Sequence, residues 1–383
     1  MKPHGIYIHI PFCRRKCDYC SFYSVPVCGF DSCIRVPDSY GTRLVREIDE
    51  RLGSRGRGTS ADTVYFGGGT PSLLTEAQIH AILRSIQERA TVDPHAEITL
   101  EMNPEDVSGE KLARFEDAGV NRIVLGMQTL SERLHAIIGR SGAVCTTKVL
   151  DLFFSSGGFQ HCVDVITGIP SQNEEELRRD IDTAAGYRPS HISAYLLSIE
   201  KNTPLSRRLS ICPDSEVEQA RLFRMTGSLL RDHGYEHYEI SNYALPGLQS
   251  RHNLKYWKFD PYIGFGPGSC SFIDGERTSN CMPVADYVRS DSTLLKKDAR
   301  TPESAAVECM MTGLRLLSGM SIRDMERLLD YTLPQAVMER IGEAHSGGMV
   351  VLDEIGSDAR MRLSETGIMF ADSVIYRIVE PLL

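Results

Sequence analysis

Short runs of apolar and β-branched residues alternate with longer amphipathic stretches through the first half of the chain. The apolar runs predict six strands, at 5–10, 63–66, 97–102, 121–125, 162–167 and 191–197. The amphipathic stretches predict helices, among them 40–51, 75–89, 108–118 and 173–185, and capping residues such as Thr75 and Asn173 open two of them. This alternation is typical of a parallel α/β sheet with right-handed crossovers. Functional side chains are then expected at the carboxyl ends of the strands.

The alternation fades after about residue 200. A helix is predicted at 216–233, and an aromatic and glycine-rich stretch at 235–272 and a linker follow it. From Thr301 the pattern is helical up to a short strand predicted at 347–352. We therefore expect three parts, at 1–235, 236–300 and 301–383, the last resembling a small winged-helix-like α+β domain.

Composition narrows the classes of function. The chain has 383 residues with 42 Lys and Arg against 51 Asp and Glu, a net charge of −9, so it offers no basic footprint for nucleic acid. No signal peptide and no apolar run long enough for a membrane span is visible, which favours the cytoplasm. Its 11 cysteines are therefore expected to be reduced thiols, metal ligands or core residues rather than disulfides.

Three of the cysteines stand close together just after the first predicted strand. Cys13, Cys17 and Cys20 have the spacing Cys-x3-Cys-x2-Cys, and thiolates at this spacing can bind one soft metal centre from a single loop. A structural zinc takes four ligands, whereas a 4Fe-4S cluster held by three cysteines leaves one iron open to another ligand. We therefore favour the cluster. Zinc, and three cysteines without a metal, are the alternatives.

Further motifs lie along the chain. They are YIHIPFC at 7–13, GGGTP at 67–71, EMNP at 101–104, LGMQ at 125–128, DVITGIP at 164–170 and HNLKYW at 252–257. With the cysteines, they resemble the radical S-adenosylmethionine (SAM) superfamily, in the branch that contains oxygen-independent coproporphyrinogen III dehydrogenase and the HemW-type haem chaperones. The resemblance covers roughly residues 5–380. It implies a partial (β/α)6 barrel that carries the three-cysteine loop after its first strand.

The resemblance also implies that the open iron of the cluster binds SAM. The positions that match the family's SAM contacts are Tyr7, Tyr19, Gly68, Gly69, Thr70, Glu101, Gln128, Arg140, Asp164, Ala194 and Cys270. Glycines without a Cβ at a strand end let backbone amides approach a ligand, although a tight turn alone would also explain them. Glu101 and Asp164 could accept hydrogen bonds from ribose hydroxyls, although lone acids more often cap helices.

Two differences between this chain and the dehydrogenase bear on which member of the branch it resembles. The dehydrogenase carries a fourth cysteine where this chain has Phe22, and a longer segment ahead of its cluster motif, where this chain has twelve residues before Cys13. Both favour the chaperone type. There, the resemblance points to His252 as an axial haem ligand, with Tyr256 and Trp257 as apolar surface for the macrocycle. A hydrogen-bonded histidine of the core is the alternative interpretation.

Two features differ from the usual pattern of the chaperones. Cys270 stands where the family usually has histidine, and an extra loop at 25–37 contains Cys28 and Cys33, which we leave out of the site. The expected function is a haem chaperone that binds a 4Fe-4S cluster, SAM and haem and delivers haem to respiratory haem proteins. A porphyrinogen-oxidising radical SAM enzyme and a zinc-stabilised structural protein are the alternatives. The acceptor, the electron donor, productive SAM cleavage and the oligomeric state stay open, a transient membrane-protein acceptor and a dimer among the choices.

Overall fold

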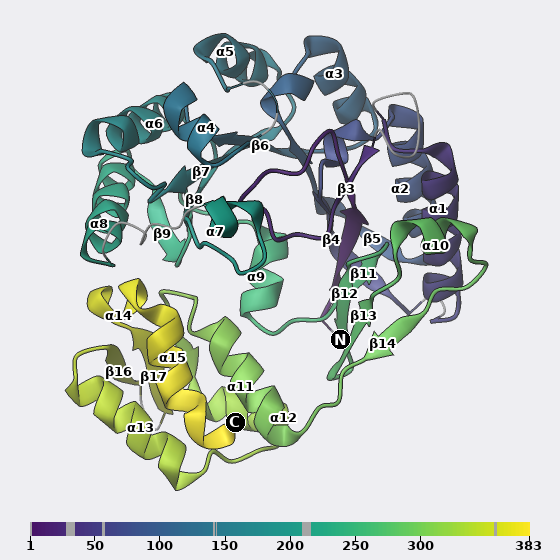
Figure 1. Ribbon diagram of the computed structural model, residues 1–383. Coiled ribbons are helices and arrows are strands. Elements are labelled where there is room, and N and C mark those ends of the chain that lie inside the picture. Colours follow the sequence, from purple (N-terminus) through teal and green to yellow (C-terminus); the bar gives the residue numbers. More distant parts are fainter. Residues whose placement is uncertain are drawn as a thin grey trace.

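The computed structural model describes residues 2–27, 35–55, 58–140, 142, 144–208, 216–355 and 358–383. Cys28 and Cys33 lie outside the described residues. The fold is a mixed α/β arrangement around one large sheet, with a smaller unit at the C-terminal end (Figure 1). Among the described residues, every helix is too short or too polar to span a bilayer.

The six predicted strands form the centre of the sheet. They are β1 (His4–Ile10), β4 (Ser60–Gly68), β5 (Thr91–Met102), β6 (Arg122–Gln128), β7 (Gln160–Thr167) and β8 (His191–Leu196). All five neighbouring pairs are parallel and follow the order of the sequence, which confirms the predicted strand and helix alternation. The carboxyl ends of these strands therefore meet on one side of the sheet, as the sequence predicts.

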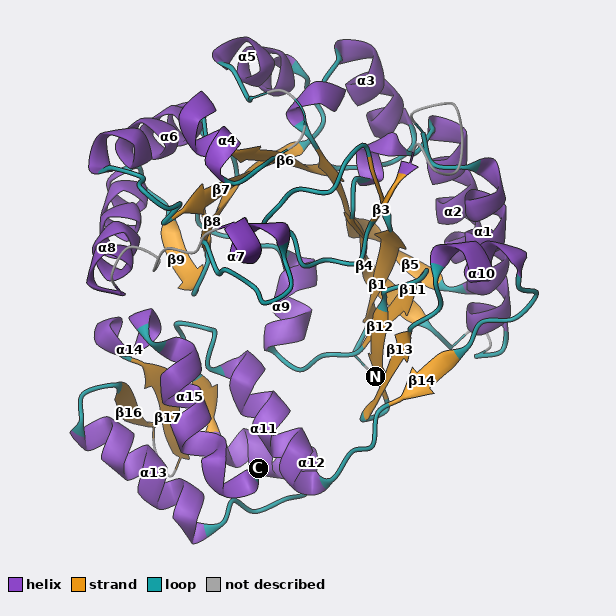
Figure 2. Cartoon of the chain, in the orientation of Figure 1, coloured by secondary structure: helices purple, strands orange, loops and turns teal. Residues whose placement is uncertain are grey.

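Helices connect these strands, and two more follow β8. They are α1 (Asp38–Gly53), α2 (Glu76–Arg89), α3 (Gly109–Asp117), α4 (Glu132–Ile137), α5 (Thr147–Ser155), α6 (Glu174–Gly186), α7 (Pro204–Arg208) and α8 (Glu216–Asp232). Figure 2 shows α1, α2, α3, α5, α6 and α8 on the outer side of the curved sheet. Thr75 and Asn173 cap α2 and α6 as expected, each within a capping box. The apolar faces of these helices and of the strands form one hydrophobic core.

The sheet continues beyond the six strands at both edges. The additional elements are β9 (Glu236–Glu239), β10 (Asn242–Ala244), α9 (Arg251–Trp257), β11 (Tyr262–Phe265), β12 (Cys270–Ile273), β13 (Glu276–Asn280), α10 (Val284–Arg289) and β14 (Leu295–Lys297). Strand β11 pairs with β1 in parallel, and the full order is β14-β13-β12-β11-β1-β4-β5-β6-β7-β8-β10-β9. This order is linear, so the curved sheet does not close on itself within the described residues.

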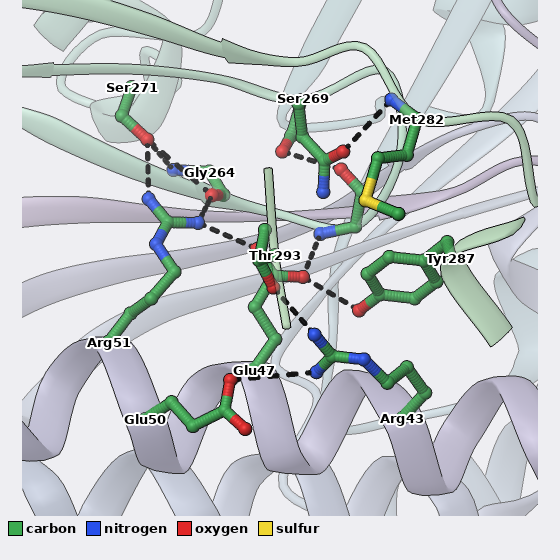
Figure 3. Close-up of polar contacts among 12 residues, drawn as sticks. Arg43, Glu47, Glu50, Arg51, Gly264, Ser269, Ser271, Met282, Tyr287 and Thr293 are labelled. Atoms are coloured by element: carbon green, nitrogen blue, oxygen red, sulfur yellow. Dashed lines mark hydrogen bonds and ion pairs between the residues drawn. The ribbon is translucent and has the colours of Figure 1, made fainter. Parts of the chain in front are cut away.

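A buried carboxylate joins the added strands to the first helix (Figure 3). Glu47 of α1 is fully buried and accepts hydrogen bonds from the Gly266 amide (3.0 Å), the Tyr287 hydroxyl (2.6 Å) and the Arg51 guanidinium (2.8 Å). The Arg51 guanidinium also donates to the Ser271 hydroxyl at 3.0 Å. The segment that the sequence leaves as a linker is therefore tied to the barrel by its polar groups.

The C-terminal unit has its own sheet and its own core. It consists of α11 (Pro302–Gly313), β15 (Met320–Ser321), α12 (Ile322–Leu329), α13 (Gln335–Ser346), β16 (Val350–Ile355), β17 (Asp358–Leu363), α14 (Glu365–Met369) and α15 (Ala371–Val379). The three strands form an antiparallel sheet beside the helices. The winged-helix-like domain expected at 301–383 stays a prediction. The strand predicted at 347–352 begins later, because Gly348 has a positive φ of 72° and forms the preceding turn.

Candidate functional site

A cavity of about 380 Å³ opens at the carboxyl ends of the central strands. Its wall contains all three cysteines of the loop after β1 and residues at or after the ends of β4, β5, β6, β7 and β8. Of the residues predicted from the sequence, it brings together Cys13, Cys17, Tyr19, Cys20, Gly68, Gly69, Thr70, Glu101, Gln128, Arg140 and Asp164. Side chains that are far apart in the sequence thus line one space, as the parallel topology requires.

The cysteine loop is held at both of its ends. Its first residues form β2 (Phe12–Cys13), which pairs in parallel with β3 (Val25–Pro26). In its middle, the Asp18 amide donates to the Gly139 carbonyl at 3.3 Å, and the Asp18 carbonyl accepts from the Leu205 amide of α7 at 2.9 Å. The loop is therefore braced against two neighbouring segments before any ligand binds.

The three thiols are partly exposed and not in disulfides. Burial raises the pKa of the Cys13 and Cys20 thiols, so binding of a metal centre would release protons from them. In the described part of the chain, no three His, Cys, Asp or Glu side chains converge on a single-ion site. The donor set nevertheless fits a cluster with one open iron, because three sulfur ligands from one loop line one cavity.

The glycines after β4 serve the protein itself. Gly68 has a φ of 111°, and a Cβ there would lie 2.6 Å from the His9 ring. A Cβ on Gly69 would lie 2.6 Å from the Phe12 carbonyl oxygen, and the Gly69 amide donates to the Ile10 carbonyl at 2.8 Å. The Gly68 amide bonds to the Glu101 carboxyl. Both amides are engaged within the protein, and the glycines allow close packing of β4 on the cysteine loop. Contact of Gly68 and Gly69 with SAM stays a prediction.

Arg140 lines the cavity and connects several of its walls. One guanidinium nitrogen donates to the Tyr19 hydroxyl at 3.0 Å, and the other donates to the Asn103 amide oxygen at 2.9 Å and the Gly126 carbonyl at 2.8 Å. These bonds join the cysteine loop to the ends of β5 and β6. Arg140 thus fixes the relative position of the thiols and the strand ends and places a positive charge beside the cavity.

Two carboxyl groups face the cavity from β5 and β7, the strands on either side of β6. Burial raises the pKa of Glu101 to about 7, although hydrogen bonds from the Tyr65 hydroxyl (2.8 Å) and the Gly68 amide oppose the rise. Burial also raises the pKa of Asp164 to about 6. Among the described atoms, Oδ1 of Asp164 is buried without a hydrogen-bond partner. This oxygen can accept a hydrogen bond from a ligand in the cavity.

Three other predicted contacts do not line this cavity. Tyr7 lies deeper in the barrel, where its hydroxyl is 3.0 Å from His9 Nδ1. Ala194 is buried within β8, opposite Val165 of β7. Cys270 lies on β12, and its thiol is 3.8 Å from the Ser279 hydroxyl. Their predicted roles toward SAM stay predictions.

The structure places His252 in the interior, on α9. It is 1% exposed, its Nδ1 is 2.8 Å from the Thr63 hydroxyl, and its Nε2 is 2.8 Å from the Tyr256 hydroxyl. Burial lowers the pKa of His252 to about 3, with Lys255 and Arg122 acting in the same direction. Both ring nitrogens are thus engaged by protein groups. The indole of Trp257 lies under the Arg315 guanidinium, 4.6 Å from it.

Sequence reasoning missed several residues of the cavity wall, among them Asn103, Glu105, Tyr195, Leu197 and Glu200. Asn103 lies inside the EMNP motif, which was a usable signal. Within the described residues, Oε2 of Glu105 is buried and has no partner, like Oδ1 of Asp164. Residues between 195 and 200 reach the cavity because the chain turns toward it after β8. No local sequence pattern predicts this turn.

Comparison with known proteins places these features in a family context. Residues 7–184 match the model of the Radical SAM superfamily. The chain is 30% identical to the heme chaperone HemW of Lactococcus lactis subsp. lactis (strain IL1403), over 99% of this chain and 98% of that protein. It is 36% identical to the heme chaperone HemW of Escherichia coli (strain K12), over 83% and 84% of the two chains.

A solved structure shares the fold. The radical SAM enzyme coproporphyrinogen III oxidase (HemN) from Escherichia coli superposes with a TM-score of 0.82, covering 98% of this chain and 90% of the other. The two sequences are 18% identical, so this likeness concerns the architecture.

Proposed function

Because the chain belongs to the heme chaperone HemW family of the radical SAM superfamily, we propose that it is a haem chaperone that holds a 4Fe-4S cluster and SAM and delivers haem to other proteins. The observation that carries the proposal is the loop of Cys13, Cys17 and Cys20 at the mouth of the barrel. Near full-length similarity to proteins named heme chaperone HemW supports the chaperone role.

We assign the two cofactors to the cavity at the strand ends. Cys13, Cys17 and Cys20 would hold the cluster, which supplies an open iron for SAM and electrons of low potential. The carboxyl groups of Glu101 and Asp164 would accept hydrogen bonds from ribose hydroxyls of SAM. Arg140 would keep the cysteine loop and the strand ends in register through its bonds to Tyr19, Asn103 and Gly126.

The first experiment measures iron, sulfide and SAM on one anaerobic preparation. The unaltered protein should contain about four irons per chain and absorb broadly near 400 nm. Cys13→Ala, Cys17→Ala and Cys20→Ala should each abolish both signals, because one lost thiolate leaves a second iron without a protein ligand. Cys281→Ala is the matched control, because this thiol is exposed and does not line the cavity. A colourless protein that retains zinc in all preparations would contradict the proposal.

The enzymatic alternative is oxidation of a porphyrinogen, and the shared architecture with coproporphyrinogen III oxidase favours testing it. The resemblance places Phe22 where the dehydrogenase type carries a fourth cysteine. We therefore expect no protoporphyrinogen from coproporphyrinogen III, SAM and a reductant with the loaded protein. Robust product formation would establish the enzyme instead of the chaperone.

The role of the HNLKYW segment in haem binding stays a prediction. Iron coordination by His252 would require one of its two 2.8 Å hydrogen bonds, to Thr63 or to Tyr256, to break. If His252 is a ligand, His252→Ala should weaken the Soret change in a haem titration. If it is a core residue, the variant should bind haem unchanged and lose stability toward urea, because two buried hydroxyls would lose their partner.

A further inference from the structure

A second hollow lies between the barrel and the C-terminal unit. This groove has a volume of about 680 Å³ and is lined by α8, β9 and β10 on one side and by Leu317 and α14 on the other. No residue of the cysteine-lined cavity, and no site residue predicted from the sequence, belongs to its wall. Its size is within the range of sites that bind small organic ligands.

A missing side chain opens one end of the groove. Gly227 is in α8, and a Cβ there would lie 3.3 Å from the Tyr243 hydroxyl oxygen and 3.4 Å from a terminal nitrogen of Arg231. Tyr243 is 1% exposed, and its hydroxyl lacks a hydrogen-bond partner among the described atoms. A buried hydroxyl of this kind costs free energy unless a ligand bonds to it. Together, the Tyr243 hydroxyl and the Arg231 guanidinium can bind a carboxylate at this position.

A second arginine lies on the same face of α8. Arg224 precedes Arg231 by two helical turns, about 10 Å along the helix axis. In the part of the chain that the structure describes, neither arginine forms an ion pair, and the Arg224 guanidinium donates to the Met369 sulfur at 3.6 Å. The wall also contains the exposed carboxylates of Glu236 and Glu365, which are not paired with either arginine. Two cationic groups are therefore available to two carboxylates of one ligand.

The rest of the wall is apolar and partly flat. The His237 ring is stacked on the Tyr243 ring, with centroids 4.1 Å apart and planes 11° apart. The His237 Nε2 bonds to the Ile240 carbonyl at 3.1 Å, and burial lowers the pKa of His237 to about 4, so the ring is uncharged at neutral pH. Phe223 and Ile368 add apolar surface from α8 and α14. A flat, mostly apolar molecule fits these surroundings.

We propose that this groove is a haem site, in which one propionate binds between Arg231 and the Tyr243 hydroxyl at Gly227 and the second binds Arg224. The macrocycle lies against the His237 ring and the apolar side chains of Phe223 and Ile368. The inference rests on the proposed chaperone function and deepens it, because it places haem away from the cysteines and from HNLKYW. Haem matches the groove by combining a flat apolar body with two carboxylates.

The test is a titration of the full-length, cluster-loaded protein with haem, followed by the Soret band. Arg231→Gln and Gly227→Ala should each weaken binding about tenfold or more, because each disrupts a charge-assisted hydrogen bond. Gly227→Ala should not harm folding, since alanine favours a helix. Tyr243→Phe should weaken binding by a smaller factor and leave thermal stability unchanged or higher. Matched controls are Gly186→Ala, where a Cβ meets nothing, and Tyr376→Phe, which is 58% exposed.

A titration with protoporphyrin IX tests the contacts of the propionates separately from any contact with the iron. This molecule carries both carboxylates without the metal, so the same variants should lose affinity for it by similar factors. Unchanged affinity for haem in folded Arg231→Gln and Gly227→Ala would overturn the groove site alone. No haem binding by the unaltered protein would overturn the proposed function and this site together. Loss confined to haem, with protoporphyrin IX unaffected, would contradict the assignment of the propionates.

Discussion

The protein holds internal carboxylates in two contrasting ways. Glu47, between α1 and the added strands, is fully buried and accepts three hydrogen bonds from Gly266, Tyr287 and Arg51 (Figure 3). At the mouth of the barrel, Asp164 has a buried oxygen that receives no hydrogen bond from the described residues, and burial raises its pKa to about 6. The protein itself supplies hydrogen-bond donors to both oxygens of Glu47, whereas Oδ1 of Asp164 has no donor among the described residues.

This difference separates polar groups that hold the fold from those that await a ligand. A buried acceptor without a donor lowers stability, so it persists only where something else gains from it. Glu47 connects α1 to α10 and to the turn after β11, and it does not line the cavity that contains the thiols. Asp164 lines the cavity that contains the thiols. The contrast is testable, because removing the charge should lower the free energy of unfolding strongly at Glu47 and only slightly at Asp164.

The largest effect on stability is expected at Glu47. Glu47→Gln replaces one carboxylate oxygen with an amide that faces donors, and it leaves the Arg51 charge without its partner. Breaking a buried ion pair costs about 3–5 kcal/mol in the free energy of unfolding. Urea unfolding of the cluster-free protein measures it, and Glu50→Gln on the same helix is the control, because Glu50 is 46% exposed and lies 3.8 Å from Arg43. Equal, small losses in both variants would remove the structural role of Glu47.

A smaller and pH-dependent effect is expected at Glu101. Its pKa rises from 4.5 to about 7 on folding, so between these values the folded state binds more protons than the unfolded state. Stability from this group is therefore highest below pH 4.5 and falls as pH rises to 7, by up to about 3 kcal/mol. Glu101→Gln should flatten this part of the curve in urea unfolding between pH 5 and pH 8. Parallel curves for the two proteins would contradict a raised pKa.

The central sheet and the cysteine loop were predictable because their signals are local. Apolar runs of the β1 and β7 type are continuous, and Thr75 and Asn173 cap helices through residues three positions away. The Cys-x3-Cys-x2-Cys spacing also lies within one loop. Each of these features depends on residues close together in the sequence, so it can be predicted without knowledge of contacts between distant segments.

The added strands were not predictable in this way. Strand β13 has the sequence Glu-Arg-Thr-Ser-Asn, which lacks apolar alternation, and it forms because β12 and β14 offer it backbone partners. The surroundings of His252 were equally hidden, since Thr63 and Glu97 reach it from β4 and β5. Contacts between residues far apart in the sequence determine whether a histidine is a core residue or a ligand, and only the fold reveals them.

The smallest effect on stability is expected at Asp164, although the effect on binding should be large. In Asp164→Asn, the amide nitrogen can take the place of Oδ1, which accepts no hydrogen bond from the described residues, so no existing bond is lost. The free energy of unfolding should therefore change by less than about 1 kcal/mol. Asp180→Asn is the matched contrast: both oxygens of Asp180 accept bonds, from the Thr129 hydroxyl at 2.7 Å and the Leu130 amide at 2.9 Å, so this change should cost about 1–3 kcal/mol. Urea unfolding gives both values, and equilibrium dialysis gives SAM binding by the cluster-loaded proteins. Asp164→Asn should weaken SAM binding while Asp180→Asn leaves it intact, because only Asp164 lines the cavity. If Asp164→Asn destabilised the fold as much as Asp180→Asn and bound SAM normally, Asp164 would belong with Glu47 among the groups that hold the fold.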